Sequence, residues 1–282
     1  MSDATNAPSI DTPPAGTTTH ERPHLSHTQL DVFARCQERY RRQYLEREKP
    51  PRGVYAARGV ALHRAAQTNW EQKIASFEDL PMADVLDAAA ASYDDEIARG
   101  VELSRDQARM GRGVVIGRER DQAVALARTY RQKIAGDYQP TLVEEHVSIE
   151  LSGTHDLWAV IDCATLDGEV VDLKTTTRRL TQADADHSMQ LTIYAAAYEV
   201  VFGAAPKAVR LEVMQCWGES PSRRRLSSVR TLDDYRVLDA RVSVMLATLE
   251  AGYFAPAPIG AWWCNESRCP FWSTCKFINA RK

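Results

Sequence analysis

The sequence predicts a mixed α/β fold, formed by one domain that carries a helical insertion. Apolar residues recur at helical spacing through much of residues 26–135, whereas from Leu142 onward they follow the pattern of strands. Asp167-Gly168 then separates two apolar runs, which is a typical hairpin signal. With 282 residues, of which 44% are hydrophobic, the chain is long enough to bury a substantial core.

The first half of the chain is expected to be a tail followed by helices. Residues 1–24 are rich in Pro and Thr and are expected to be disordered. Ser26 opens a capping-box pattern, so we expect a helix from there to about Tyr44. A second helix follows Gly59, and residues 76–135 form an Ala-rich, amphipathic insertion of two or three helices.

Strands and helices alternate in the second half of the chain. Three strand-like runs come first, followed by a helix, another strand, a further helix and a short cysteine-rich segment. The three strand-like runs are expected at 142–151, 157–166 and 169–174, and the helix that follows at 188–202. The next strand is expected at 209–217, the further helix at 232–249 and the cysteine-rich segment at 262–277. Residues 25–282 are therefore expected to form a single domain.

Charge and hydropathy exclude several classes of protein. The net charge is −3, no run of 18 apolar residues predicts a membrane span, and the first residues lack the apolar stretch of a signal peptide. We therefore expect no membrane partner and a cytoplasmic location, which would be the host cytoplasm if the chain is phage-encoded. The six cysteines are not expected to form a disulfide framework in that compartment.

Charge is strongly segregated along the chain. Residues 35–58 and 105–133 each carry eight Lys or Arg residues against three acidic ones. Residues 144–172 carry eight acidic residues and no Lys or Arg. Because this acidic segment is strand-like, and buried carboxylates need a partner, its composition indicates a bound cation.

Two carboxylates and an ammonium group are expected to meet on the hairpin. Asp172 and Lys174 project from the same face of one strand, and the turn brings Asp162 of the preceding strand beside them. An exposed hairpin with a cross-strand salt bridge is the alternative. Because both acids directly follow apolar runs, we favour a buried site with a hard cation such as Mg²⁺, which offsets the cost of burying carboxylates.

These residues resemble the PD-(D/E)XK nuclease superfamily, and more narrowly its RecB-like branch. Asp162 followed by DLKTT at residues 172–176 is similar to the paired strand motifs of that branch, GVALH at 59–63 to its GxxxH element, and QLTIY at 190–194 to its QxxxY element. The resemblance implies a restriction-endonuclease-like core, which is a central mixed sheet flanked by helices.

The resemblance also implies a role for each side chain. The implied ligands of Mg²⁺ or Mn²⁺ are His63, Asp162, Asp172 and the Leu173 carbonyl. The implied catalytic residues are Asp162, Asp172, Lys174, Gln190 and Tyr194. Glu145, on the strand before the hairpin, is held as an accessory group. The alternatives are a core histidine at 63 and a helix that merely packs its tyrosine on the sheet.

Four cysteines form a second expected site. Cys264, Cys269 and Cys275 lie close together near the end of the chain, and Cys36 lies in the first expected helix. This arrangement resembles the iron–sulfur members of the RecB-like branch, including the Cas4 and AddB types. It implies a [4Fe–4S] cluster that links the N- and C-terminal regions of the chain. Four thiolates also suit zinc, which we consider the weaker interpretation.

The expected function is that of a metal-dependent DNA exonuclease, which acts on DNA ends or single strands in recombination, repair or phage DNA processing. Its expected partners are DNA and a helicase or recombination protein, with DNA contacts from Arg39, Arg42, Arg58, Arg223 and Arg224. The alternatives are a non-catalytic DNA-binding scaffold on a nuclease fold, a Cas4-type nuclease of CRISPR adaptation, and a small iron–sulfur or zinc regulator.

Overall fold

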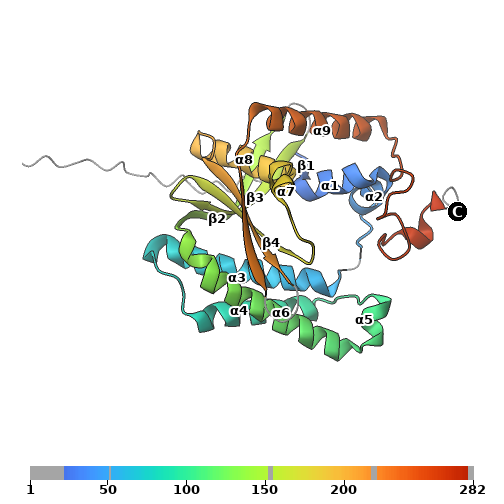
Figure 1. Ribbon diagram of the computed structural model, residues 1–282. Coiled ribbons are helices and arrows are strands. Elements are labelled where there is room, and N and C mark those ends of the chain that lie inside the picture. Colours follow the sequence, from blue (N-terminus) through green and yellow to red (C-terminus); the bar gives the residue numbers. More distant parts are fainter. Residues whose placement is uncertain (1–21, 51, 152–154, 217–220, 279–282) are drawn as a thin grey trace, which may run out of the picture.

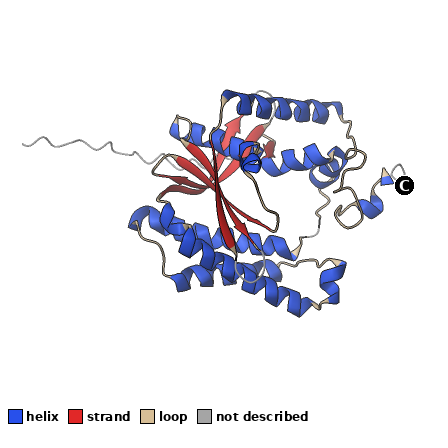
Figure 2. Cartoon of the chain, in the orientation of Figure 1, coloured by secondary structure: helices blue, strands red, loops and turns tan. Residues whose placement is uncertain are grey.

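A mixed β-sheet with helices on both faces forms the centre of the molecule (Figures 1 and 2). The computed structural model describes residues 22–50, 52–151, 155–216 and 221–278. Six strands of these residues form the sheet, in the order β1-β3-β4-β5-β6 with β2 paired to β3. They are β1 (His24–Ser26), β2 (Pro140–Glu150), β3 (Asp156–Thr165), β4 (Glu169–Thr176), β5 (Ala208–Gln215) and β6 (Ser222–Ser228). The expected central mixed sheet flanked by helices is confirmed.

The hairpin between β3 and β4 has the turn that the sequence predicts. Gly168 adopts a φ of 80°, a left-handed conformation in which a side chain would be strained. Its backbone N–H donates to the carbonyl of Thr165 at 2.9 Å. Beyond this antiparallel pair, β5 runs parallel to β4, which requires a crossover through helices on one face of the sheet.

Four helices lie on one side of the sheet. They are α3 (Val54–Ser76), α4 (Met82–Ala98), α5 (Arg105–Arg109) and α6 (Arg112–Lys133), and they lie below the sheet in Figure 1. Of these, α3 and α6 contact the sheet, and α4 and α5 pack on these two. Trp70 of α3 and Tyr130 of α6 are fully buried and pack edge to face, with ring centroids 5.4 Å apart. Their cluster includes Val171 and Leu173 of β4, so α3 is held against the strand that carries the acidic motif. The helices expected at 76–135 are α4 to α6, which we call the helical lobe.

The opposite face is covered by α1 (His27–Arg35), α7 (Gln182–Asp186), α8 (Met189–Phe202) and α9 (Leu232–Ala251). Phe33, Leu191 and Ile193 from these helices are buried against Ile161 and other apolar residues of the sheet. Among the described residues, no helix is both long and apolar enough to cross a membrane.

The single helix expected from Ser26 to Tyr44 is wrong in its continuity. Ser26 does cap α1, but Cys36 then has extended backbone angles and separates α1 from α2 (Gln37–Tyr40). The Sγ atom of Cys36 accepts a hydrogen bond from the backbone N–H of Arg39 at 3.4 Å. The thiol therefore caps the second segment, which continues into the π-helical turn η1 (Arg41–Leu45).

Three short elements were not expected from the sequence. Strand β1 pairs in parallel with the start of β3, although its residues were assigned to the tail and the helix cap. Strand β6 follows β5, and α7 precedes α8. The expected disorder of residues 1–24 lies largely outside the described residues, but His24 already belongs to the sheet.

The C-terminal segment packs against the N-terminal helices, to the right of α1 and α2 in Figure 1. The backbone N–H of Glu38 donates to the carbonyl of Ala255 at 3.0 Å, and Gln37 accepts from the N–H of Ala255 at 2.9 Å. Arg42 donates to the hydroxyl of Thr274 at 2.8 Å, and Thr274 is the last residue of the 3-10 turn η3 (Trp272–Thr274). Segments more than 200 residues apart are thus joined by specific polar contacts.

A buried ion pair joins α3 to the helical lobe. Nη1 of Arg58 lies 2.8 Å from Oε2 of Glu119, and each side chain is only 8% exposed. The expectation that Arg58 contacts DNA is therefore wrong, because its guanidinium group is enclosed by protein and compensates a buried carboxylate. Its charge stabilises the contact between helices and is not presented at the surface.

We predict that Arg58→Ala lowers the free energy of unfolding by about 3–5 kcal/mol, since it leaves Glu119 buried without a partner. The double variant Arg58→Met/Glu119→Leu is expected to recover most of that loss, because no charge then remains inside. Urea unfolding measures both. A stable Arg58→Ala protein that no longer binds DNA would instead restore the DNA-contact role.

Candidate active site

The candidate site lies where the sheet is interrupted. Strand β3 pairs with β2 along its length, while its other edge is shared by β1 at residues 156–158 and by β4 at residues 163–164. Asp162 lies in the gap between these two pairings. Its Oδ2 atom accepts a hydrogen bond from the backbone N–H of Leu173 at 3.0 Å. The buried side chain of Asp162 thus accepts a hydrogen bond that a neighbouring strand would otherwise accept from Leu173. From this point β3 and β4 diverge.

A hydrogen-bonded chain connects the two acidic residues to Lys174. Nζ of Lys174 donates to Oε1 of Gln190 at 2.9 Å, and Nε2 of Gln190 donates to Oδ1 of Asp172 at 3.0 Å. Nε2 of Gln190 also lies 2.9 Å from the hydroxyl of Tyr194, which in turn donates to Oδ1 of Asp162 at 3.4 Å. The five residues expected to be catalytic from the sequence are therefore brought together by one network.

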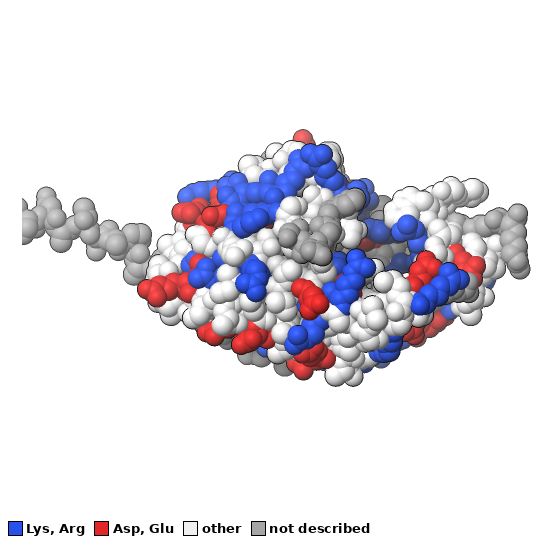
Figure 3. Space-filling view, turned by 60° about the horizontal axis from the view of Figure 1, so that its bottom comes forward, with Lys and Arg blue, Asp and Glu red and all other residues white. Residues whose placement is uncertain are grey.

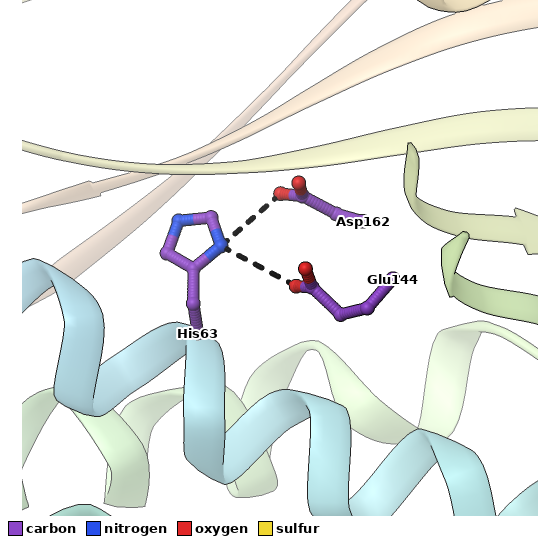
Figure 4. Close-up of side chains that lie close together, drawn as sticks. All are labelled: His63, Glu144 and Asp162. Atoms are coloured by element: carbon purple, nitrogen blue, oxygen red, sulfur yellow. Dashed lines mark ion pairs between the residues drawn. The ribbon is translucent and has the colours of Figure 1, made fainter. Parts of the chain in front are cut away.

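His63 and Glu144 approach the same point from the other side (Figure 4). Nδ1 of His63, on α3, lies 3.3 Å from Oδ2 of Asp162 and 3.9 Å from Oε1 of Glu144, on β2. Glu144 has a φ of 47°, which is unusual for a residue with a side chain and indicates local strain. That backbone conformation directs the carboxylate toward His63 at the position where the sheet opens.

Burial and crowding shift the pKa values of these groups. Burial raises the pKa of Asp162 to about 7, and the neighbouring Asp172 carboxylate contributes in the same direction. Burial also raises the pKa of Asp172. Burial alone would lower the pKa of His63, but the Asp162 and Glu144 carboxylates outweigh it and raise it to about 9. In the absence of a cation, the site therefore retains protons because it concentrates negative charge.

The donor set fits a divalent cation. Among the described residues, ligand atoms of His63, Glu144 and Asp162 all lie within 4.8 Å of one another. Oδ2 of Asp172 is buried and has no hydrogen-bond partner in the described part of the chain, so a carboxylate oxygen remains available. Carboxylate, carbonyl and imidazole donors together suit Mg²⁺ or Mn²⁺.

Glu144 is the site residue that the sequence analysis missed. Glu145 was held as the accessory acid, but its side chain is exposed and its neighbour occupies the site. Regular alternation along a strand cannot distinguish two adjacent glutamates when the backbone is irregular at one of them. The presence of two adjacent acids on the strand that precedes the hairpin was the available signal, whereas the left-handed conformation of Glu144 was not encoded in any recognisable motif.

The four candidate cluster cysteines are located at one end of the molecule. Cys36 lies at the break between α1 and α2, and the other three lie in the C-terminal segment that packs there. Burial raises the pKa of the Cys269 thiol, and the nearby Cys264 and Cys36 thiols add to that shift. Within the described residues, however, they do not form a group of three with sulfur atoms within 4.8 Å of one another.

The arginines expected to contact DNA fall into two groups. Arg42 is buried, pairs with Glu48 at 2.6 Å and stacks on the ring of Phe271, so it links the chain ends. Arg223 pairs with the fully buried Glu212 at 2.6 Å. The expectation for Arg42 is corrected, because its guanidinium group is buried and compensates Glu48. Arg223 is partly exposed, so its contact with DNA remains a prediction. Arg39 and Arg224 are partly exposed and remain predictions.

Fold and site together define a class of protein, namely hydrolytic nucleases that place acidic residues and a lysine on a divergent hairpin. A family model of the PD-(D/E)XK nuclease superfamily matches residues 24–276, and the chain belongs to this family. The fold resembles that of a "Putative exonuclease" from Eubacterium rectale, with a TM-score of 0.54, 12% sequence identity, and coverage of 92% of this chain and 88% of that one. A protein named SSO0001 is less similar, with a TM-score of 0.41, 15% identity and coverage of 92% and 89%. Among curated proteins, none matches the chain.

We predict that Glu144→Gln weakens Mn²⁺ binding about 10–100-fold, since loss of a residue that contacts or supports a metal site typically has that effect. Glu145→Gln is the matched control, because it removes the same charge from the adjacent exposed position. Calorimetric titration with Mn²⁺ measures both. Equal weakening by the two variants would show a general loss of negative charge instead of a ligand at 144.

Proposed function

We propose that the protein is a metal-dependent DNA exonuclease, acting on DNA ends or single strands in recombination, repair or phage DNA processing. The observation that carries the proposal is the network joining Asp162, Asp172 and Lys174 at the divergence of β3 and β4. Membership of the nuclease superfamily supports it, as does the likeness of the fold to that of the protein named "Putative exonuclease".

In the proposed site, His63, Glu144, Asp162, Asp172 and the Leu173 carbonyl would hold the metal. A bound Mg²⁺ or Mn²⁺ would polarise a phosphate oxygen and lower the pKa of bound water. Gln190 holds the ammonium group of Lys174 next to Asp172, so this charge is positioned before substrate arrives. Lys174 would then stabilise negative charge that develops on the phosphate, at little cost of reorganisation.

The surface supports an anionic substrate more clearly than the net charge does. Lys and Arg side chains gather on the upper part of the face shown in Figure 3, bordered by a few acidic ones, while both kinds of charge are interspersed over the rest of that view. Such a distribution favours phosphate contacts on one side of the molecule even though the chain as a whole is slightly acidic.

We predict that Lys174→Ala lowers the rate of DNA cleavage at least 100-fold, because a preorganised charge at the reacting phosphate is lost. Lys207→Ala is the control, since Lys207 is an exposed lysine at the other end of the β4–β5 pair. The assay uses 5′- and 3′-labelled single- and double-stranded DNA with Mg²⁺ or Mn²⁺. If wild type and Lys174→Ala are equally inactive under all conditions, the nuclease proposal fails and the non-catalytic alternative is favoured.

We further propose that Cys36, Cys264, Cys269 and Cys275 hold a [4Fe–4S] cluster. The docking of the C-terminal segment on the break at Cys36, and the proximity of Cys269 to two of the other thiols, support this proposal. A cluster there would reinforce an attachment that already rests on polar contacts between the two segments. Zinc bound to the same thiolates is the alternative.

We expect anaerobically purified protein to be brown and to contain about four iron and four sulfide per chain, the composition of the proposed cluster. Cys269→Ser should lose the colour. Cys163→Ser serves as the control, because Cys163 is buried in the sheet and distant in sequence from the segment. A colourless protein with zinc would contradict the cluster while leaving the nuclease proposal intact.

A further inference from the structure

Two hollows adjoin on the face covered by α1, α8 and α9. The larger, of about 920 Å³, is lined by both Lys174 and Gln190, so it opens directly onto the candidate active site. The smaller, of about 540 Å³, lies between α1, α9 and residues 255–258 of the C-terminal segment. Both hollows are lined by Ala34, Arg35, Met189 and Arg241, so they adjoin, and we treat them as one groove. We call the two parts the basic cleft and the apolar pocket.

The basic cleft has the charge expected of a phosphate-binding surface. Five Lys or Arg residues line it against two aspartates; the cations are Arg35, Lys174, Arg178, Arg179 and Arg241. Asp31 pairs with Arg35 and Asp184 with Arg178, so both acids are already compensated. Within the described residues, Arg179 and Arg241 form no ion pair, and they leave positive charge open to a ligand.

The apolar pocket has a different composition. Its wall is formed mainly by hydrocarbon side chains and proline rings, including Leu30, Phe33, Val244, Pro256 and Pro258. Phe33 is buried in the core, so this part of the wall is rigid, whereas Val244 on α9 is 59% exposed. Such a wall offers a phosphate only Arg35, Gln37 and Arg241, the two arginines being shared with the basic cleft, whereas the flat face of a nucleobase packs favourably on its hydrocarbon part, as bases do in proteins that bind single strands.

We propose that the groove binds one strand of DNA, with its phosphates in the basic cleft and one unstacked base in the apolar pocket. The inference rests on the proposed function in taking DNA as the substrate. The groove selects a single strand over a duplex, because a base that is paired and stacked in a duplex must first be freed before it can enter a pocket. Arg241 lies at the junction and contacts the phosphate next to the inserted base.

The electrostatic part is tested by fluorescence anisotropy with a labelled oligodeoxynucleotide in EDTA, where no cleavage occurs. Arg241→Glu is expected to weaken binding about tenfold or more and to reduce the salt dependence by roughly one phosphate contact. Arg236→Glu is the control, since Arg236 is an exposed arginine of the same helix that does not line the groove. Equal effects of both variants would overturn the proposal.

The base pocket is tested with oligonucleotides that carry one abasic site at successive positions. One position is expected to lose about tenfold in affinity, within the range measured for stacked bases. Ala240→Leu, which adds bulk at an exposed residue of the pocket wall, should weaken the intact strand similarly and abolish sensitivity to that abasic site. Uniform affinity along the abasic series, or equally tight binding of blunt duplex, would overturn the proposal.

These measurements are independent of catalysis. If the protein fails to cleave DNA with any metal but shows the position-specific loss in EDTA, the proposed function fails and the single-strand groove stands. If it cleaves DNA but Arg241→Glu and Ala240→Leu bind as wild type does, the groove fails and the proposed function stands.

Discussion

The hydrogen bond from the backbone of Leu173 to the carboxylate of Asp162 is the contact on which the site depends. It satisfies a strand N–H without a neighbouring strand, so β3 and β4 can separate while remaining buried. The opening that results admits side chains from both faces of the sheet. His63 reaches it from α3 below, whereas Gln190 and Tyr194 reach it from α8 above. An uninterrupted ladder would keep these helices on opposite sides of a closed layer.

This arrangement has an energetic cost that the surrounding fold must offset. Two carboxylates are buried close together, and burial raises the pKa values of both. The apolar clusters on the two faces hold the strands that carry these carboxylates. The Arg58–Glu119 pair attaches α3 to the helical lobe, and α3 places His63 beside the carboxylates. The protein therefore stores part of its folding free energy in a site suited to bind a cation.

Much of the fold and of the site follows from the sequence, and the exceptions share a physical cause. The hairpin, α8 and α9 have strong periodicity or turn residues, and Asp162, Asp172, Lys174 and His63 stand in short motifs. The break at Cys36 and strand β1 could not be predicted, because each depends on segments distant in the chain. Glu144 was missed because its role arises from one backbone angle. Arg42 and Arg58 were misinterpreted, since composition does not reveal which charges are compensated inside the protein.

The contact of residues 255–258 with α1 and α2 also depends on the order in which the chain is synthesised. Gln37 and Ala255 are 218 positions apart, so the contact cannot form until residue 255 has left the ribosome. His63, Asp162, Asp172 and Lys174 are all synthesised earlier. The residues of the candidate active site are therefore synthesised before residues 255–258, which form one wall of the neighbouring groove. A partly synthesised chain thus carries the site residues before it has the complete surface that would hold a DNA strand beside them.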